Sequence, residues 1–166
     1  MFSLRSEKFR KLWFKNGKIH RKKGAALEVV NFQGKKTTEW FLLGVRHRED
    51  GPALDNGRGF VKYFFQGIEY DIEKTADGQE CKAVYENKIV LHSIQDKPAV
   101  ICNGTKEWYR YGKLHRMLLP AVIYSNGDQE WWINGKRHNY LGPAVIIGNN
   151  QYWFHHGEFI RCIASK

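Results

Sequence analysis

Aromatic residues recur through this chain at an almost constant spacing. The series has seven anchor positions, which are Trp13, Trp40, Tyr63, Tyr85, Trp108, Trp131 and Trp153. Successive anchors lie 27, 23, 22, 23, 23 and 22 residues apart. A unit of this length is too short to bury an apolar face by itself, so such units must stack and share a core. The spacing therefore predicts a repeat array.

Other residue types follow the anchors in the same register. Most units have a glycine four residues after the anchor and an alanine thirteen residues after it. A histidine seven residues after the anchor completes the pattern in five units, at His20, His47, His92, His115 and His138. Asn-Gly pairs between apolar residues, such as Asn16-Gly17 and Asn134-Gly135, indicate two-residue hairpin turns, in which both central residues need a positive φ.

These columns predict an all-β fold. We expect an elongated, single-layer antiparallel meander of about seven β-hairpin repeats, each of 22–27 residues. Residues 1–12 are expected to form a basic arm, and residues 13–166 a single repeat domain whose units start near residues 13, 40, 63, 85, 108, 131 and 153. The units from Tyr63 and Tyr85 depart most from the pattern, so residues 67–84 could form either a loop or a distorted hairpin.

The clearest unit has an aromatic pair followed by Asn-Gly-Lys, His and Gly-Pro-Ala and reads EWWINGKRHNYLGPAVIIGNNQYW; in other units the histidine is followed by arginine. This pattern resembles the membrane-occupation-and-recognition-nexus (MORN) repeats. It is most similar to their variant in bacterial antitoxin-like proteins and in phage and large-virus proteins. The resemblance extends from about Trp13 to Arg161. It implies a sheet of stacked hairpins that serves as a binding or scaffolding module.

Composition suggests a cytoplasmic protein. The mean hydropathy is −0.58, no apolar run is long enough to span a membrane, and the N-terminal residues lack the apolar core of a signal peptide. Cys81, Cys102 and Cys162 are odd in number and have no paired spacing, which argues against a disulfide framework or a zinc site. We therefore expect a reducing, intracellular location.

Positive charge is concentrated at the start of the chain. Residues 1–36 hold 11 Lys or Arg against two Glu, whereas the whole chain carries a net charge of +10. Such a cluster attracts anionic partners, although it could also be the solvated cap that a terminal repeat needs. The candidate residues for an anionic partner are Arg10, Lys11, Lys15, Lys18, Arg21, Lys22, Lys23, Lys35 and Lys36.

The sequence offers no candidate for catalysis, for a cofactor or for a metal. Histidines in successive units would lie two strands apart, about 9.5 Å, which is too far for shared coordination of one ion. We expect them to bond backbone groups of their own or the neighbouring hairpin. His155-His156 is an isolated pair whose role the sequence leaves open. No serine has a nucleophile-elbow context, and Gly-rich phosphate loops are absent, so we expect a protein that is not an enzyme.

Three hypotheses for function remain. The first is a protein-binding module that acts as an inhibitor or adaptor, and the resemblance makes a phage or viral modulator of a host factor the concrete version. The second is binding of nucleic acid or an anionic membrane surface through residues 1–36. The third is a structural scaffold, with self-association through exposed sheet edges as a further possibility. Protein binding ranks first because the basic cluster covers only one end of the array.

Overall fold

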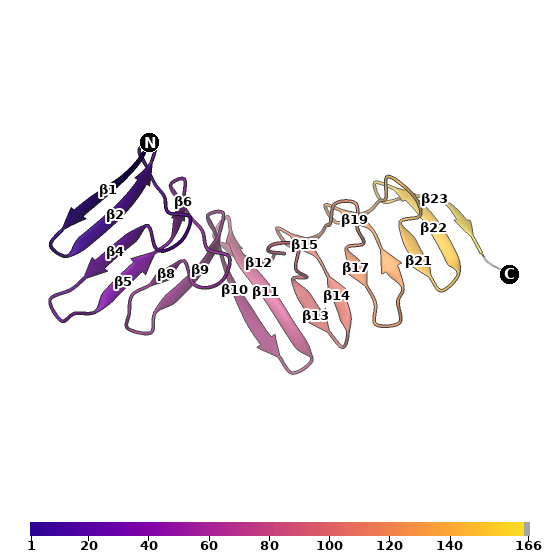
Figure 1. Ribbon diagram of the computed structural model, residues 1–166. Coiled ribbons are helices and arrows are strands. Elements are labelled where there is room, and N and C mark those ends of the chain that lie inside the picture. Colours follow the sequence, from indigo (N-terminus) through magenta and orange to yellow (C-terminus); the bar gives the residue numbers. More distant parts are fainter. Residues whose placement is uncertain (165–166) are drawn as a thin grey trace. The chain divides into compact units, whose positions relative to one another are not determined.

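The fold is known from a computed structural model, which describes residues 1–164. All regular structure in this part of the chain is β, and the strands follow one another as an antiparallel meander (Figure 1). The predicted all-β meander is therefore confirmed. The chain divides into two compact units, Met1–Asp71 and Ile72–Lys166, which are described separately below. Among the described residues there is no helix of the length and apolarity needed to cross a membrane.

The first unit starts with the hairpin β1–β2, whose strands pair over their full lengths from Phe2↔Lys15 to Glu7↔Arg10. Residues 2–12 belong to this hairpin, so they do not form the separate arm that the repeat register suggested. The main sheet continues through β4, β5, β8 and β9 to the first part of β10, whose residues Ile68–Tyr70 pair with β9; from Ile72 onward β10 belongs to the second unit. The strand bounds are β1 Phe2–Glu7, β2 Arg10–Lys15, β3 Lys18–Ile19, β4 Leu27–Val30, β5 Lys36–Glu39, β6 Phe41–Leu42, β7 Val45–Arg46, β8 Leu54–Asp55, β9 Val61–Phe65 and β10 Ile68–Thr75.

The second unit continues the pattern from β11 to β23. Its main sheet pairs β11 with β13, then β14, β17, β18, β21, β22 and β23 in order. Residues 67–84, which the sequence left open between a loop and a hairpin, lie mostly in the eight-residue strands β10 and β11. The bounds are β11 Gly78–Tyr85, β12 Lys88–Leu91, β13 Val100–Cys102, β14 Thr105–Glu107, β15 Tyr109–Arg110, β16 Lys113–Leu114, β17 Val122–Ile123, β18 Gln129–Glu130, β19 Trp132–Ile133, β20 Lys136–Arg137, β21 Val145–Ile147, β22 Asn150–His155 and β23 Glu158–Ile163.

Each regular repeat adds a short two-stranded ribbon to its main-sheet hairpin. At Trp40 the chain leaves β5 and enters β6, which pairs only with β7 across a two-residue turn. The turn residues Leu43 and Gly44 have φ angles of 53° and 89°, the combination that two-residue hairpins favour. The ribbons of neighbouring repeats are bonded to each other as well, since the Gly44 amide donates to the Ile19 carbonyl at 2.8 Å.

The core lies where the anchor backbone meets the alanine column. The anchor amide donates to the alanine carbonyl of its own repeat, for example Trp108 to Ala121 and Trp131 to Ala144, both at 2.8 Å. Close backbone approach leaves room only for a methyl group, and a larger side chain would overpack the interior. Five alanines of the column are completely buried, namely Ala26, Ala53, Ala99, Ala121 and Ala144, whereas Ala76, thirteen residues after Tyr63, is exposed.

The fourth repeat differs from the sequence register. Tyr85 is exposed, and the amide that bonds the column alanine Ala99 belongs to Cys81, at 2.6 Å. His92 likewise donates its amide to the Cys81 carbonyl, as His115 does to the carbonyl of Trp108. Cys81 therefore takes the place that tryptophan has elsewhere. The reason is a longer hairpin, because β11 and β12 form four residue pairs where the regular ribbon forms two.

Candidate binding grooves of the first unit

The five column histidines connect each repeat to the next one. Their Nδ1 atoms each accept a backbone amide from the ribbon turn of the following repeat, at 3.1–3.2 Å. We call these bonds the histidine ladder; its pairs are His20 with Leu43, His47 with Gln66, His92 with Tyr111, His115 with Asn134 and His138 with His156. This agrees with the expectation that the column contacts backbone groups of the neighbouring hairpin. An accepting Nδ1 needs a neutral ring.

Burial reinforces the neutral state of these rings. It lowers the pKa of four ladder histidines below the ordinary value, because the charged imidazolium would lose its hydration. Nearby positive charge acts in the same direction: Lys15 lowers the pKa of His20, and Arg110 lowers that of His92 and His115. The ladder is thus a set of structural contacts spread along the repeats.

The arginine that follows the ladder histidine covers the anchor of its own repeat. The Arg48 guanidinium lies 4.0 Å from the Trp40 ring centroid, and its Nη1 donates to the Pro52 carbonyl at 3.1 Å. This placement is a cation–π contact that also closes the loop back to the main sheet. The same stacking joins Arg21 to Trp13 at 4.0 Å and Arg116 to Trp108 at 3.9 Å. In the last unit, where Ile160 replaces the histidine, Arg161 still stacks on Trp153 at 4.4 Å.

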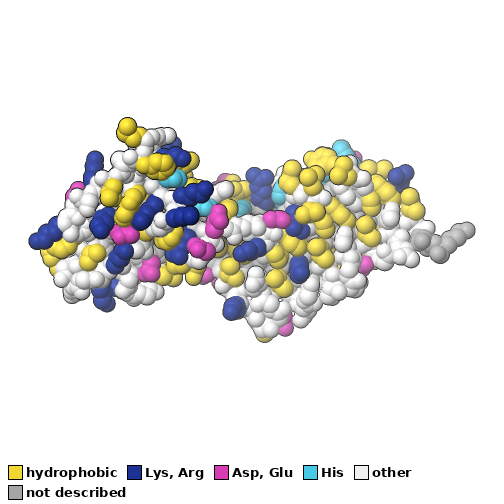
Figure 2. Space-filling view, in the orientation of Figure 1, with side chains coloured by type: hydrophobic (Ala, Val, Ile, Leu, Met, Phe, Trp, Pro, Cys, Tyr) yellow, Lys and Arg dark blue, Asp and Glu magenta, His cyan; other side chains and the backbone are white. Residues whose placement is uncertain are grey.

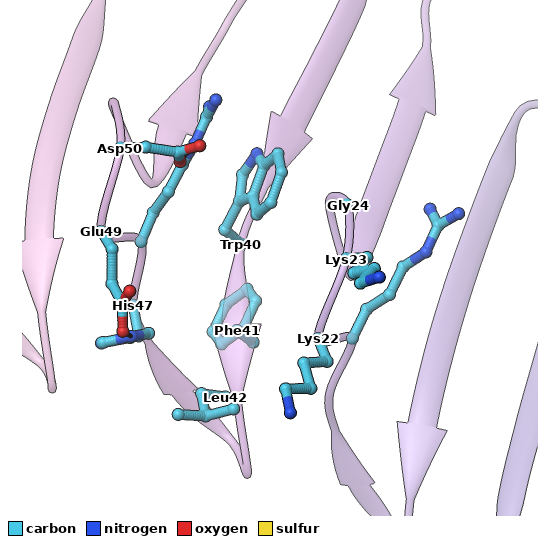
Figure 3. Close-up of a pocket in the computed structure, with 11 residues that line it drawn as sticks. Lys22, Lys23, Gly24, Trp40, Phe41, Leu42, His47, Glu49 and Asp50 are labelled. Carbon is cyan, nitrogen blue, oxygen red and sulfur yellow. Dashed lines mark hydrogen bonds and ion pairs between the residues drawn. The ribbon is translucent and has the colours of Figure 1, made fainter.

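A groove of about 550 Å³ opens in the first unit between two equivalent loops (Figure 3). Residues 21–24 form one wall, residues 47–50 form the other, and residues 40–42 form the floor. The floor presents Trp40, Phe41 and Leu42 side by side in the close-up. Because the floor is apolar and the walls are charged, the groove can bury an apolar group while polar groups of the same ligand contact its edges.

The two walls carry opposite charge. Lys22 and Lys23 are exposed, and neither has an ion-pair partner among residues 1–164. On the other wall, Asp50 accepts from Arg48 at 3.0 Å, and Glu49 lies 3.6 Å from the Nε2 atom of His47. The lysine wall is consequently free to contact a carboxylate or phosphate, whereas the acidic wall would repel a second anion.

A second groove, of about 260 Å³, lies one repeat nearer the N-terminus. Phe2 and Leu4 of β1 line it together with Trp13 and Phe14 of β2. Its rim includes Arg21 and Lys22, which also line the first groove. The loop that carries these two cations therefore separates two apolar grooves. The second groove exists because β1 takes the position beside β2 that a preceding repeat would take.

The structure brings only some of the predicted basic residues to these grooves. Arg21, Lys22 and Lys23 line them, and the space-filling view shows the basic side chains spread over the first unit (Figure 2). Lys36 is paired with Glu28 at 3.0 Å instead. The residues that line neither groove are Arg10, Lys11, Lys15, Lys18, Lys35 and Lys36.

Sequence reasoning missed the acidic wall, formed by Glu49 and Asp50, and the accessibility of the groove floor. The Trp-Phe-Leu run at 40–42 was visible, but it indicated core residues. Leu42 is 37% exposed, and Trp40 and Phe41 are half-buried. The useful signal was the loop after each histidine, where the same spacing carries Arg-Lys-Lys in the first repeat and Arg-Glu-Asp in the second.

Comparisons with known proteins return nothing. No protein-family model matches the chain, and neither a curated protein nor a solved structure matches it. The resemblance to MORN-type repeats consequently stays a prediction from the sequence pattern.

Proposed function

We propose that this chain is a binding protein that docks another protein through the grooves of its first unit and acts as an inhibitor or adaptor. The observation that carries the proposal is the pair of adjacent apolar grooves separated by a loop with unpaired lysines. The ligand is an extended segment of the partner, with an aromatic or aliphatic side chain for each floor. Acidic residues of that segment contact Lys22 and Lys23.

The acidic wall favours a protein ligand over nucleic acid. A nucleic acid strand would bring a phosphate every few ångströms, and phosphates next to Glu49 and Asp50 would be repelled. A polypeptide can alternate its charges and place a basic side chain there. The exposed apolar side chains at the grooves, such as Phe2 at 69% and Leu42 at 37%, also suit a protein interface with an apolar centre and a polar rim.

Selection from a random peptide display library tests this proposal. We expect enriched peptides to carry a large apolar residue next to acidic ones. Reversing the lysine wall with the double substitution Lys22→Glu and Lys23→Glu should change the enriched flank from acidic to basic. Leu42→Ala should weaken binding of a selected peptide about tenfold, since it removes roughly 1–2 kcal/mol of buried apolar contact.

Lys35→Glu provides the matched control, because Lys35 is an exposed lysine of the same unit that lines neither groove. It should leave the selected peptides unchanged. Failure to enrich any sequence, or enrichment that ignores the reversal of Lys22 and Lys23, would refute the groove as a protein-binding site.

The competing hypothesis of nucleic acid binding has a different signature. Anisotropy with a single-stranded oligonucleotide should then show an affinity that falls steeply between 50 and 200 mM salt, by about 10³-fold or more if six phosphates are contacted. We expect only weak, nonspecific binding. Lys35→Glu should reduce it as much as Lys22→Glu or Lys23→Glu does. Tight binding lost only in the Lys22 and Lys23 variants would assign the loop to nucleic acid instead.

A further inference from the structure

The ladder histidine of the last complete repeat has an unsatisfied atom. His138 is 98% buried, since only 2% of its surface is exposed. Its Nδ1 accepts the His156 amide at 3.2 Å, but its Nε2 has no hydrogen-bond partner among residues 1–164. A buried ring nitrogen without a partner is rare, because its lost hydration is not replaced.

Two further imidazoles surround this atom's ring. The His156 ring stacks on His138 with centroids 4.2 Å apart, and the His155 ring lies edge-on with centroids 5.1 Å apart. One ring nitrogen from each of the three residues falls within 4.8 Å of the other two. Neutral imidazole nitrogens gathered this closely can act together as ligands of one metal cation.

We propose that His138, His155 and His156 bind a divalent transition-metal ion, with Zn²⁺ as the reference case and Cu²⁺ or Ni²⁺ as alternatives of the same ligand chemistry. Imidazole suits these ions, and three histidines with one open position form a known zinc geometry. Ligands about 2.0–2.1 Å from a tetrahedral zinc lie about 3.3 Å from each other. The cluster is therefore slightly too wide and must contract by about 1.5 Å on binding.

Contraction requires movement of the exposed residues only. The His138 and His156 rings are nearly parallel, at 5°, so their in-plane lone pairs cannot meet at one point until one ring turns. His155 ends β22, and His156 begins the turn that follows; both side chains are exposed and can change rotamer. His138 is held by burial and supplies the fixed ligand. Metal binding thus gathers two surface rings onto one buried ring.

The proton on His138 must move for this to happen. While Nδ1 accepts the His156 amide, the neutral ring carries its proton on Nε2. Coordination through Nε2 places the proton on Nδ1, which then faces another donor. The ion consequently replaces one ladder bond with coordinate bonds, and the His156 amide loses its acceptor. Because the His156 amide loses its acceptor, metal binding at this site should shift the resonance of that amide, whereas an adventitious ion on the surface should not.

Equivalent positions in the other repeats cannot form this site. The residues that donate to the other ladder histidines are Leu43, Gln66, Tyr111 and Asn134. None of the four brings an imidazole or a thiolate, since Gln66 and Asn134 offer only a carboxamide. The pair His155-His156 is therefore what distinguishes the last ladder position.

Titration of tag-free protein with ZnCl₂ by calorimetry tests the proposal. We expect one ion per chain with a micromolar dissociation constant. His155→Ala and His156→Ala should each weaken binding about tenfold, and the double variant at least a hundredfold. Both changes keep the backbone amide of the ladder, so circular dichroism of the variants should match the parent. In ¹H–¹⁵N correlation spectra, Zn²⁺ should shift the His156 amide.

His115→Asn is the matched control, because it changes a ladder histidine of the same unit that lies outside the cluster and both grooves, and it should leave Zn²⁺ binding unchanged. Three results would overturn the proposal. They are no saturable binding up to 1 mM ZnCl₂, an unchanged dissociation constant in the His155→Ala, His156→Ala double variant, or binding that leaves the His156 amide resonance in place.

Discussion

Replacing His92 by alanine removes one bond of the histidine ladder in the interior of the second unit. The Nδ1 of His92 accepts the Tyr111 amide at 3.1 Å, and the two rings lie 4.7 Å apart. Only 7% of the histidine is exposed, so water cannot reach the amide through an unchanged structure. If the ladder holds neighbouring repeats together, alanine should leave a buried donor and a cavity.

The expected loss follows from these two terms. A buried amide without its acceptor costs about 1–3 kcal/mol. Losing the buried ring adds about 1 kcal/mol of apolar contact. The free energy of unfolding should therefore fall by about 2–4 kcal/mol. His92→Asn should recover about half of that loss, because the carboxamide oxygen can take the position of Nδ1 and accept the same amide.

Urea unfolding followed by tryptophan fluorescence measures both variants. The accompanying decrease in melting temperature should be about 5–15 °C for His92→Ala, since 1 kcal/mol corresponds to about 2–4 °C in a chain of this size. Ile89→Ala on the same hairpin is the control; Ile89 is 74% exposed, so its loss should change stability by less than about 0.5 kcal/mol. Equal destabilisation by alanine and asparagine, or a loss below 0.5 kcal/mol in His92→Ala, would refute the ladder as a source of stability.

Three further predictions concern pH, glycine and arginine. Burial lowers the pKa of His20, His92 and His115 in the folded state below their unfolded value near 6.5. The free energy of unfolding should therefore be highest above about pH 6.5 and should fall at lower pH, because the unfolded chain binds more protons than the folded one. A urea midpoint that rises between pH 7 and pH 5 would contradict this. Gly78→Ala should prevent folding of its strand, because a Cβ there would lie 1.9 Å from the Ile101 carbonyl oxygen. A Cβ at Gly127 would meet no atom within 4 Å, so Gly127→Ala should lower the free energy of unfolding by only about 1–2 kcal/mol through backbone strain. Thermal unfolding of the two variants measures the difference. Arg116→Met should lower the free energy of unfolding by about 2 kcal/mol, since Arg116 stacks on Trp108 at 3.9 Å and donates to Asp96 at 2.7 and 2.8 Å. Lys88→Met, at an exposed position, is the control and should leave the urea midpoint unchanged.

Periodicity was sufficient to predict the fold because the repeat columns correspond to backbone requirements. Asn16-Gly17 and Asn134-Gly135 predicted turns, and all four residues have positive φ between 50° and 79°. The alanine column was recognisable from spacing alone, and its members are fully buried except Ala76, which is exposed beyond the end of β10. Each of these signals is local, so a single sequence contains it.

The fourth repeat shows where such reasoning reaches its limit. Counting back seven residues from His92 leads to Tyr85, an aromatic residue, so the register looked intact. Hydrogen bonding places Cys81 there instead, because a hairpin lengthened by two residue pairs keeps the spacing of the apolar pattern while moving the anchor. Pairing between strands determines which residue takes the anchor position, and no local signal in the sequence reports that pairing. The grooves were missed for a related reason, since the exposure of Leu42 depends on which loops flank it.

The ladder also explains why the repeats can share a fold although the first residues of their ribbon turns differ. Its donor is a backbone amide, so the bond places no demand on the side chain of the donating residue. That residue must only accept a left-handed conformation, and Leu43, Gln66 and Tyr111 do so with φ near 50°. A non-glycine residue in this region costs about 1–2 kcal/mol, which the hydrogen bond to the histidine acceptor offsets. The first turn position of each ribbon is therefore structurally fixed in its backbone and free in its side chain. Leu43 and His156 stand at equivalent positions of two repeats and illustrate that freedom.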